Sequence, residues 1–362
     1  MRSIVCDYRE RLQEFLERQF TGSDVLLLNS ARGGLIIVLA HLKKSFPDRK
    51  QVLIPAYICP SVPETVIKAG LEPVPVGVAD DLNISLEHLE QQLSANVLAV
   101  ICVHMYGKEM DMERAGMLCR KHDVFLIDDA AQLGTAKSAA RPCGSYGDFG
   151  LVSFAQSKSI VTGVRGSGGV LLVNSNKGKA LIQKDQLPLN ESRGRICQLL
   201  YFYLAYIHGE KFGRLVYYWE RLKQRLNMKA MDHYKVSHIS NIEAAIAYTQ
   251  FQSLQQRMLN QQGKISLAKK LLSDHNCFSL PQVAGNTYLT RLMLQLHPSV
   301  ELETFRKLLS SQGISTRLGY NGNKKLLEIP CKGRLSMREF KDMCNRINRI
   351  TNCQSESLEN KL

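Results

Sequence analysis

The sequence lacks several patterns that would assign it to common protein classes. No apolar run reaches the length of about 18 to 20 residues that a membrane-spanning helix needs, and no signal-peptide core follows Met1. The ten cysteines form no Cys-x-x-Cys pair and no Cys/His spacing typical of a metal site. These absences predict a protein of the reducing cytosol with free thiols and no metal. No G-x-G-x-x-G segment opens a predicted helix, which disfavours a nicotinamide-binding fold.

Acidic residues are also scarce relative to basic ones. The chain has 33 Asp and Glu against 47 Lys and Arg, which gives a formal net charge of +14. Such an excess favours an anionic partner, and a nucleotide-linked substrate, a membrane surface and nucleic acid would each supply one. Because the sequence shows no nucleic-acid-binding signature, nucleic acid ranks last and is not an expected partner.

The remaining composition indicates a large folded core. Apolar residues make up 44% of the 362 residues, enough for two domains or for one large domain with an appendage. Strand and helix patterns alternate from residue 25 to 175, which predicts a mostly parallel α/β sheet. We expect four parts: a helical arm (1–20), a large α/β domain (21–235), an aromatic and basic helical insertion within it (190–230), and a small α+β domain (236–362).

Two carboxylates end one of the predicted strands. The stretch VFLIDDAAQ (124–132) is a buried-strand pattern that finishes in Asp128 and Asp129. In open α/β sheets ligands bind at the carboxyl ends of the strands, so an acid placed there should face a site. Adjacent strand residues point to opposite faces, so the two acids cannot share one role. One of them, Asp128, is also suited to cap a following helix.

A single lysine lies in the next strand-to-strand loop. Lys158 follows the apolar run that ends at Ser153 and Phe154, and a glycine cluster ending at Gly169 precedes the next strand pattern. An unprotonated lysine amine attacks aldehydes, and neighbouring glycines allow the backbone to approach a bulky cofactor. Most lysines in such loops are merely solvated. A functional role for Lys158 is therefore predicted only because the strand that ends in two carboxylates precedes it.

In order and spacing these segments resemble the DegT/DnrJ/StrS family of sugar aminotransferases. The family has an acid-Asp-Ala-Ala-Gln motif, then Gly-Asp, then Ser-Phe, with its cofactor lysine five residues after that serine. The corresponding residues here are Asp128 to Gln132, Gly147-Asp148, Ser153-Phe154 and Lys158. The resemblance implies a fold type I domain, pyridoxal 5'-phosphate (PLP) as cofactor, and Lys158 as the catalytic residue that holds it. It also implies a set of cofactor-binding residues: Ala31, Arg32, Asp129, Gln132, Ser153 and Lys158.

The chain departs from the family pattern at three places. Ser30-Ala31-Arg32 replaces Ser-Gly-Thr, so Arg32 is expected to bind the phosphate in place of the threonine hydroxyl. Cys59 occupies the position of the aromatic residue that stacks on the PLP ring, so either Cys59 replaces that face or Tyr57 turns in to supply it. Residues 236–238 (Val-Ser-His) replace the Asn-Tyr-Arg whose Asn reaches the partner subunit's phosphate.

The resemblance implies a homodimeric aminotransferase that makes an amino sugar for surface polysaccharide or secondary-metabolite synthesis. Its substrates would be a keto sugar, nucleotide-linked or otherwise anionic, and an amino donor, usually glutamate. A dehydratase of the same family is an alternative, although those enzymes carry histidine in place of Lys158. A non-catalytic assembly protein at a membrane surface is another. We expect a cytoplasmic protein, and the basic amphipathic segment 196–226 is suited either to a peripheral contact at the inner face of the membrane or to a partner subunit.

Overall fold

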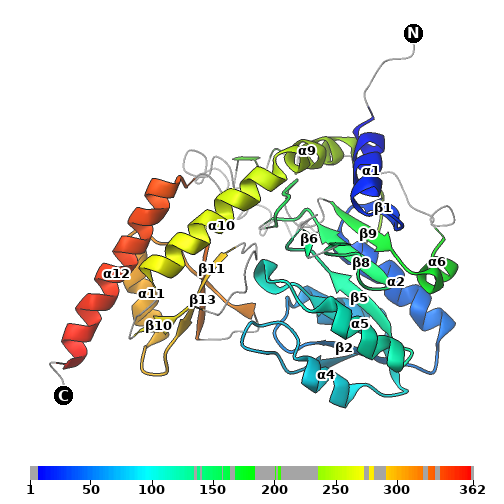
Figure 1. Ribbon diagram of the computed structural model, residues 1–362, viewed down its shortest axis with the longest axis horizontal. Coiled ribbons are helices and arrows are strands. Elements are labelled where there is room, and N and C mark those ends of the chain that lie inside the picture. Colours follow the sequence, from blue (N-terminus) through cyan, green and yellow to red (C-terminus); the bar gives the residue numbers. More distant parts are fainter. Residues whose placement is uncertain are drawn as a thin grey trace, which may run out of the picture.

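The computed structural model of the chain has a larger part and a smaller C-terminal part (Figure 1). It describes residues 7–133, 137–138, 141–156, 158–163, 168–183, 200, 203–204, 235–272, 277–280, 291–320, 325–330 and 335–359. In the larger part helices cover both faces of a central sheet, and in the smaller part helices pack on a short sheet. The predicted insertion at 190–230 and the segment 196–226 lie almost wholly outside the described residues, so their expected roles stay predictions.

Seven strands form the large sheet, in the order β1-β9-β8-β5-β4-β2-β3. Their bounds are β1 (Asp24–Leu28), β2 (Gln51–Pro55), β3 (Glu72–Val76), β4 (Val97–Val103), β5 (Phe125–Asp129), β8 (Phe149–Ser153) and β9 (Gly169–Val173). β9 is antiparallel to both its neighbours, β1 and β8, whereas the other pairs are parallel. All strands except β9 therefore run in one direction, and the expected mostly parallel α/β fold is confirmed.

The sequence of each strand matches its place in the sheet. All seven residues of β4 (VLAVICV) are buried, as expected of a parallel strand covered on both faces. β3 contains Pro73 and Pro75, which cannot donate hydrogen bonds, and it lies at an edge of the sheet with one neighbour. Along β1 the side chains alternate between two cores: Leu26 and Leu28 join one, and Val25 and Leu27 join the other.

Helices occupy both faces of this sheet. Their bounds are α1 (Tyr8–Gln19), α2 (Ala31–Ser45), α3 (Ser61–Lys68), α4 (Leu86–Gln92), α5 (Met112–Lys121) and α6 (Asn176–Leu181). Shorter elements are the 3-10 turn η1 (Met105–Gly107) and the hairpin of β6 (Lys137–Ser138) with β7 (Arg141–Pro142). Apolar residues of α2 and α3 share a core with Leu26 and Leu28, whereas α4 and α5 form a separate core on β2, β3 and β4.

The smaller part is an antiparallel sheet with helices packed against it. Its strands are ordered β10 (Phe278–Ser279), β11 (Arg291–Leu296), β13 (Leu326–Pro330) and β12 (Arg317–Leu318). Its helices are α10 (Leu254–Leu271), α11 (Leu302–Ser311) and α12 (Met337–Glu359). In Figure 1, α10 runs from the large sheet to the small one, so it connects the two parts.

The N-terminal helix and α9 (Asn241–Gln252) pack on the larger part. Leu12 and Leu16 of α1 are fully buried in the same core as Ala247 and Phe251 of α9. The sequence-based division at 236 assigned α9 to the small domain, but its apolar face lies on the large sheet. The domain boundaries themselves stay a prediction. No helix in the described part of the chain has the length and apolar character needed to cross a membrane.

Candidate active site

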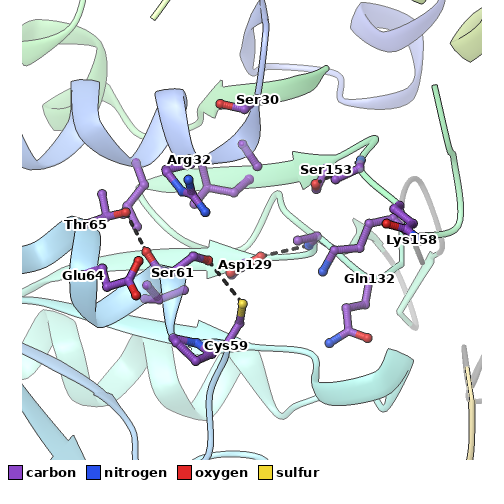
Figure 2. Close-up of a pocket in the computed structure, with 18 of the residues that line it drawn as sticks. Ser30, Arg32, Cys59, Ser61, Glu64, Thr65, Asp129, Gln132, Ser153 and Lys158 are labelled. Atoms are coloured by element: carbon purple, nitrogen blue, oxygen red, sulfur yellow. Dashed lines mark hydrogen bonds between the residues drawn. The ribbon is translucent and has the colours of Figure 1, made fainter. Parts of the chain in front are cut away.

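A cavity of about 310 Å³ lies where the parallel strands of the large sheet end. Because β1, β2, β5 and β8 run in the same direction, the residues after each of them meet at this edge. Figure 2 shows the labelled side chains converging there from these four strand ends. The lining includes all six residues expected from the sequence to bind a cofactor: Ala31, Arg32, Asp129, Gln132, Ser153 and Lys158.

The N-terminus of α2 forms one wall of this cavity. Ser30 is the N-cap, and its Oγ accepts a hydrogen bond from the Gly33 N–H at 3.0 Å. The first N–H groups of a helix have no acceptor within the helix, so they favour an anion at this end. A Cβ on Gly169 would lie 2.2 Å from the Ala31 nitrogen, so this close approach of β9 to the turn requires glycine. The Arg32 side chain extends into the cavity (Figure 2).

The segment that replaces the family's Asn-Tyr-Arg lies directly beside this turn. Ser237 accepts a hydrogen bond from the Asn29 N–H at 2.9 Å through its carbonyl, and its own N–H donates to Asn29 Oδ1 at 3.3 Å. His238 forms a β-bridge with Leu28. These residues therefore bind the end of β1 in their own chain.

The two carboxylates at the end of β5 have different surroundings. Asp128 is fully buried, and its Oδ2 accepts the N–H groups of Gly144 at 2.7 Å and Tyr146 at 3.1 Å. Its Oδ1 accepts a hydrogen bond of 3.0 Å from His104 Nε2, while His104 Nδ1 accepts the Met110 N–H at 3.1 Å. Asp128 thus holds a turn and a buried histidine. The suggestion that it caps a following helix is wrong, because its oxygens are bound to these groups instead.

Asp129 points to the opposite face of the strand and lines the cavity. Its side chain is 8% exposed, and Oδ1 accepts the Ala131 N–H at 2.9 Å. Burial raises the pKa of this carboxyl, and the nearby Lys158 charge opposes that rise only in part. A carboxylate in this position favours a positively charged group of a ligand.

Lys158 projects into the cavity from the loop that follows β8. In Figure 2 its side chain extends towards Asp129. The loop is bound from α9 by Gln250, whose Oε1 accepts the Val161 N–H at 3.0 Å and whose Nε2 donates to the Val161 carbonyl at 2.6 Å. A lysine on a loop held in this way has a defined direction.

Gln132 and Ser153 line the floor and the side of the same cavity. Gln132 is 6% exposed, and its carbonyl accepts a hydrogen bond from Ser159 Oγ at 3.0 Å, which joins the turn after β5 to the Lys158 loop. Ser153 ends β8 opposite Gly169, and its Oγ accepts the Ala155 N–H at 3.4 Å. Both side chains are therefore placed by strand ends.

Of the two residues considered for the ring-stacking position, only Cys59 lines the cavity. Its Sγ lies 3.2 Å from the Ser61 hydroxyl. The Tyr57 hydroxyl lies 2.6 Å from that of Tyr106 and accepts the Tyr320 N–H at 3.0 Å, so the ring belongs to a buried tyrosine cluster behind the cavity. Burial raises the pKa of Tyr57, which stays protonated.

The smaller C-terminal part contributes residues that the sequence did not reveal. Arg291 and Tyr320 line the same cavity, although they lie more than 100 residues after Lys158 in the chain. Arg291 forms an ion pair with the buried Glu328, which also accepts a hydrogen bond from Tyr106. No local motif marks these positions, because they reach the site only through packing of the two parts. Among the described residues no group of three or more His, Cys, Asp or Glu could hold a metal ion.

The fold and the site define an α/β protein with a cavity at the strand ends that is lined by a lysine and a buried carboxyl group. A sequence model of the DegT/DnrJ/EryC1/StrS aminotransferase family matches residues 5–330. The chain therefore belongs to this family, which confirms the resemblance read from its motifs.

Curated relatives match over part of their length. GDP-perosamine synthase of Vibrio cholerae is 28% identical over 148 residues, which cover 40% of this chain and 39% of that protein. UDP-N-acetyl-3-dehydro-alpha-D-glucosamine 3-aminotransferase of Acidithiobacillus ferrooxidans is 32% identical over 144 residues, covering 40% and 38%. The matched stretch thus spans about two fifths of each relative.

Solved structures match over nearly the whole chain. The aminotransferase PseC of Helicobacter pylori, involved in pseudaminic acid biosynthesis, superposes with a TM-score of 0.74 at 14% identity, covering 96% of this chain and 91% of that one. GDP-4-keto-6-deoxy-D-mannose-3-dehydratase of E. coli, with bound hydrated PLP, gives 0.72 at 14% identity, covering 95% and 92%. These likenesses confirm the fold.

Proposed function

We propose that the protein is a PLP-dependent aminotransferase that converts a keto sugar into an amino sugar. The observation that carries the proposal is the placement of Lys158 and Asp129 in one cavity beside the N-terminus of α2. Membership of an aminotransferase family supports the reaction class.

The residues present in the cavity fit PLP. A lysine can bind its aldehyde, and the buried Asp129 carboxylate favours a protonated ring nitrogen. The helix N-terminus with Arg32 and Ser153 suits its phosphate, and Gln132 suits the ring hydroxyl. Cys59 would lie against the ring face in place of an aromatic side chain. When bound, PLP supplies the electron sink that stabilises negative charge at the substrate carbon.

With PLP bound, Lys158 would have a second task besides holding the cofactor. Its amine would move a proton to and from the substrate carbon, as a general acid and base positioned within the site. The two hydrogen bonds between Gln250 and Val161 hold the loop that carries Lys158 against α9. Tyr320 and Arg291 line the same cavity from the smaller C-terminal part, where they are placed to contact a bound substrate.

The substrate class follows from relatives and charge. Relatives are named as enzymes acting on GDP- and UDP-linked sugars, which supports a nucleotide-linked keto sugar. The net charge of +14 favours such an anionic substrate. The alternative is a sugar dehydratase, since a dehydratase of known structure has the same fold. Against it, Lys158 occupies the position at which the dehydratases of the family carry histidine.

The experiment that tests the proposal starts from purified protein supplied with PLP. We expect a visible absorption band that borohydride abolishes, and peptide mapping should then find the pyridoxyl group on Lys158. Incubation with glutamate and nucleotide-linked 4-keto or 3-keto sugars should yield 2-oxoglutarate and an amino sugar. A protein that binds no PLP would contradict the proposal, and loss of a sugar hydroxyl without amine transfer would identify a dehydratase.

Arg32 is expected to contribute to PLP retention. Arg32→Ala should weaken PLP binding by roughly 10- to 100-fold, because a hydrogen bond to a charged group is worth about 1.5–3 kcal/mol. Equilibrium dialysis of PLP against the wild type, Arg32→Ala and Arg32→Lys measures the effect, and the lysine variant should retain part of it. Equal affinity in all three would show that Arg32 does not bind the phosphate.

We further propose a cytoplasmic homodimer, as expected from the sequence. Light scattering of the PLP-loaded protein measures its mass. The proposed contact of 196–226 with the inner face of the membrane is tested by flotation with anionic vesicles. Binding at low salt that is lost at high salt supports it, because surface charges are screened by salt. Absence of flotation at low salt would exclude it.

A further inference from the structure

A second cavity, of about 510 Å³, lies on the other side of Lys158. Its walls are the Lys158 loop, one face of α10 and the start of α12. Lys158 lines both cavities, so the two spaces adjoin at this residue. Nothing in the proposed binding of PLP uses this second space.

The wall supplied by α10 is a polar stripe. Arg257, Asn260, Gln261 and Lys264 follow the spacing i, i+3, i+4 and i+7, which places them on one side of the helix. A helix face that packs inside a protein is ordinarily apolar. Here two of the four residues, Gln261 and Lys264, are buried, at 4% and 7% exposed.

Lys264 is the residue of this stripe on which the inference below depends. Its side chain is 7% exposed, and within the described chain its ammonium group makes no hydrogen bond or ion pair. Glu339, on the exposed first turn of α12, senses the Lys264 charge only weakly, since its pKa is lowered mainly by its hydrogen bonds to Ser336. Lys264 lines the cavity together with Arg257, so the two positive charges favour an anion there.

Arg257 behaves differently from Lys264. Its Nη1 donates to the Ser159 carbonyl at 2.9 Å and its Nη2 to the Gln250 carbonyl at 2.7 Å. Arg257 therefore fixes the Lys158 loop to α10, and it adds positive charge beside the cavity.

The start of α12 forms the other wall. Ser336 and Glu339 cap this helix reciprocally, since the Glu339 N–H donates to Ser336 Oγ and the Ser336 N–H donates to the Glu339 carboxylate. The helix has 23 residues, and the N-terminal end of its dipole also favours an anion. Met337 lies against α10, where a Cβ on Gly263 would be 3.3 Å from its Cε.

We infer that this second cavity binds a carboxylate of the amino donor, with Lys264 as the specificity-determining residue. The inference rests on the proposed function. In an amino acid the carbon of the α-carboxylate is two bonds from the amine nitrogen. A side-chain carboxylate is only a few bonds farther away. A donor whose amine reaches the position of Lys158 therefore places a carboxylate in the adjoining space. The phosphates of a nucleotide sugar are separated from the reacting carbon by the sugar ring, which places them farther away.

The experiment measures binding and turnover separately. Calorimetric titration of the PLP-loaded protein with glutarate, a dicarboxylate without an amine, should give a dissociation constant roughly 10- to 100-fold higher for Lys264→Met than for the wild type. Lys264→Arg should restore most of the affinity. Lys270→Met removes the same charge from an exposed position of α10 and should change nothing. In turnover, Lys264→Met should raise KM for glutamate by a similar factor and leave KM for the sugar unchanged.

The outcomes separate the inference from the function on which it rests. Unchanged glutarate binding and unchanged KM for glutamate in a folded Lys264→Met variant would overturn the inference while leaving the aminotransferase intact. A fall in inorganic phosphate binding or a rise in KM for the sugar alone would assign the cavity to the sugar substrate and also overturn it. A wild type that retains no PLP before the titration would instead contradict the proposed function, whether or not the protein then binds glutarate.

Discussion

Replacement of Lys158 by alanine is expected to lower transamination by roughly 1,000-fold or more. The variant loses both the amine that holds PLP and the group that moves the proton at the substrate carbon, and proton transfer alone contributes about 10²- to 10⁴-fold. Turnover with glutamate and a nucleotide-linked keto sugar measures the loss. Borohydride treatment should leave no pyridoxyl peptide.

Two further variants make this result specific. Lys158→Arg keeps the positive charge but not the nucleophilic amine, so it should be as inactive as alanine. Lys270→Ala, at an exposed position of α10, should retain full activity. More than a tenth of wild-type activity in Lys158→Ala would show that another group performs the reaction.

Asp129→Asn is expected to have opposite effects on activity and on stability. Loss of the charge beside the ring nitrogen removes one partner of a buried pair, which is worth about 3–5 kcal/mol, so activity should fall by roughly 150- to 5,000-fold. Without PLP, however, the variant should unfold at a higher temperature than the wild type. Burial raises the pKa of Asp129 in the folded protein, so the ionised carboxylate destabilises the fold at neutral pH.

The stabilisation of the apoprotein by Asp129→Asn is expected to depend on pH. The folded protein binds the Asp129 proton more tightly than the unfolded chain does, so stability falls as pH rises from the ordinary carboxyl pKa through the raised one. The difference in melting temperature between apo wild type and apo Asp129→Asn should therefore shrink when the pH is lowered through that interval. A difference that grows towards acid pH would contradict this account.

The neighbouring carboxylate provides a matched control. Asp128→Asn should destabilise the protein by about 1.5–3 kcal/mol, because the Asp128 carboxylate accepts three hydrogen bonds, two of them from Gly144 and Tyr146. Denaturant unfolding of the two variants compares them directly. If Asp129→Asn destabilised the apoprotein as much as Asp128→Asn does, Asp129 would be a structural residue as well, contrary to the prediction.

The sequence by itself determined the fold class and the central pair of the candidate site. β4 and β5 are short apolar runs whose length and flanking turns identify buried parallel strands. Once the strands are known to be parallel, their carboxyl ends must share one edge, so Asp129 and Lys158 had to lie near each other. The alternation of side chains along β5 likewise separated Asp128 from Asp129 before any contact was known. These conclusions follow from local periodicity, which the chain carries in itself.

Only the tertiary structure decided which other side chains complete the site. Cys59 and Tyr57 are two residues apart, and the local sequence could not choose between them. Tyr57 points away because Tyr106 and Tyr320, from distant parts of the chain, bind its hydroxyl. Arg291 and Lys264 reach the two cavities only because α10 carries the small domain back over the strand ends. Contacts between segments so far apart depend on how the larger and smaller parts pack against each other, and no periodicity within either part encodes that packing.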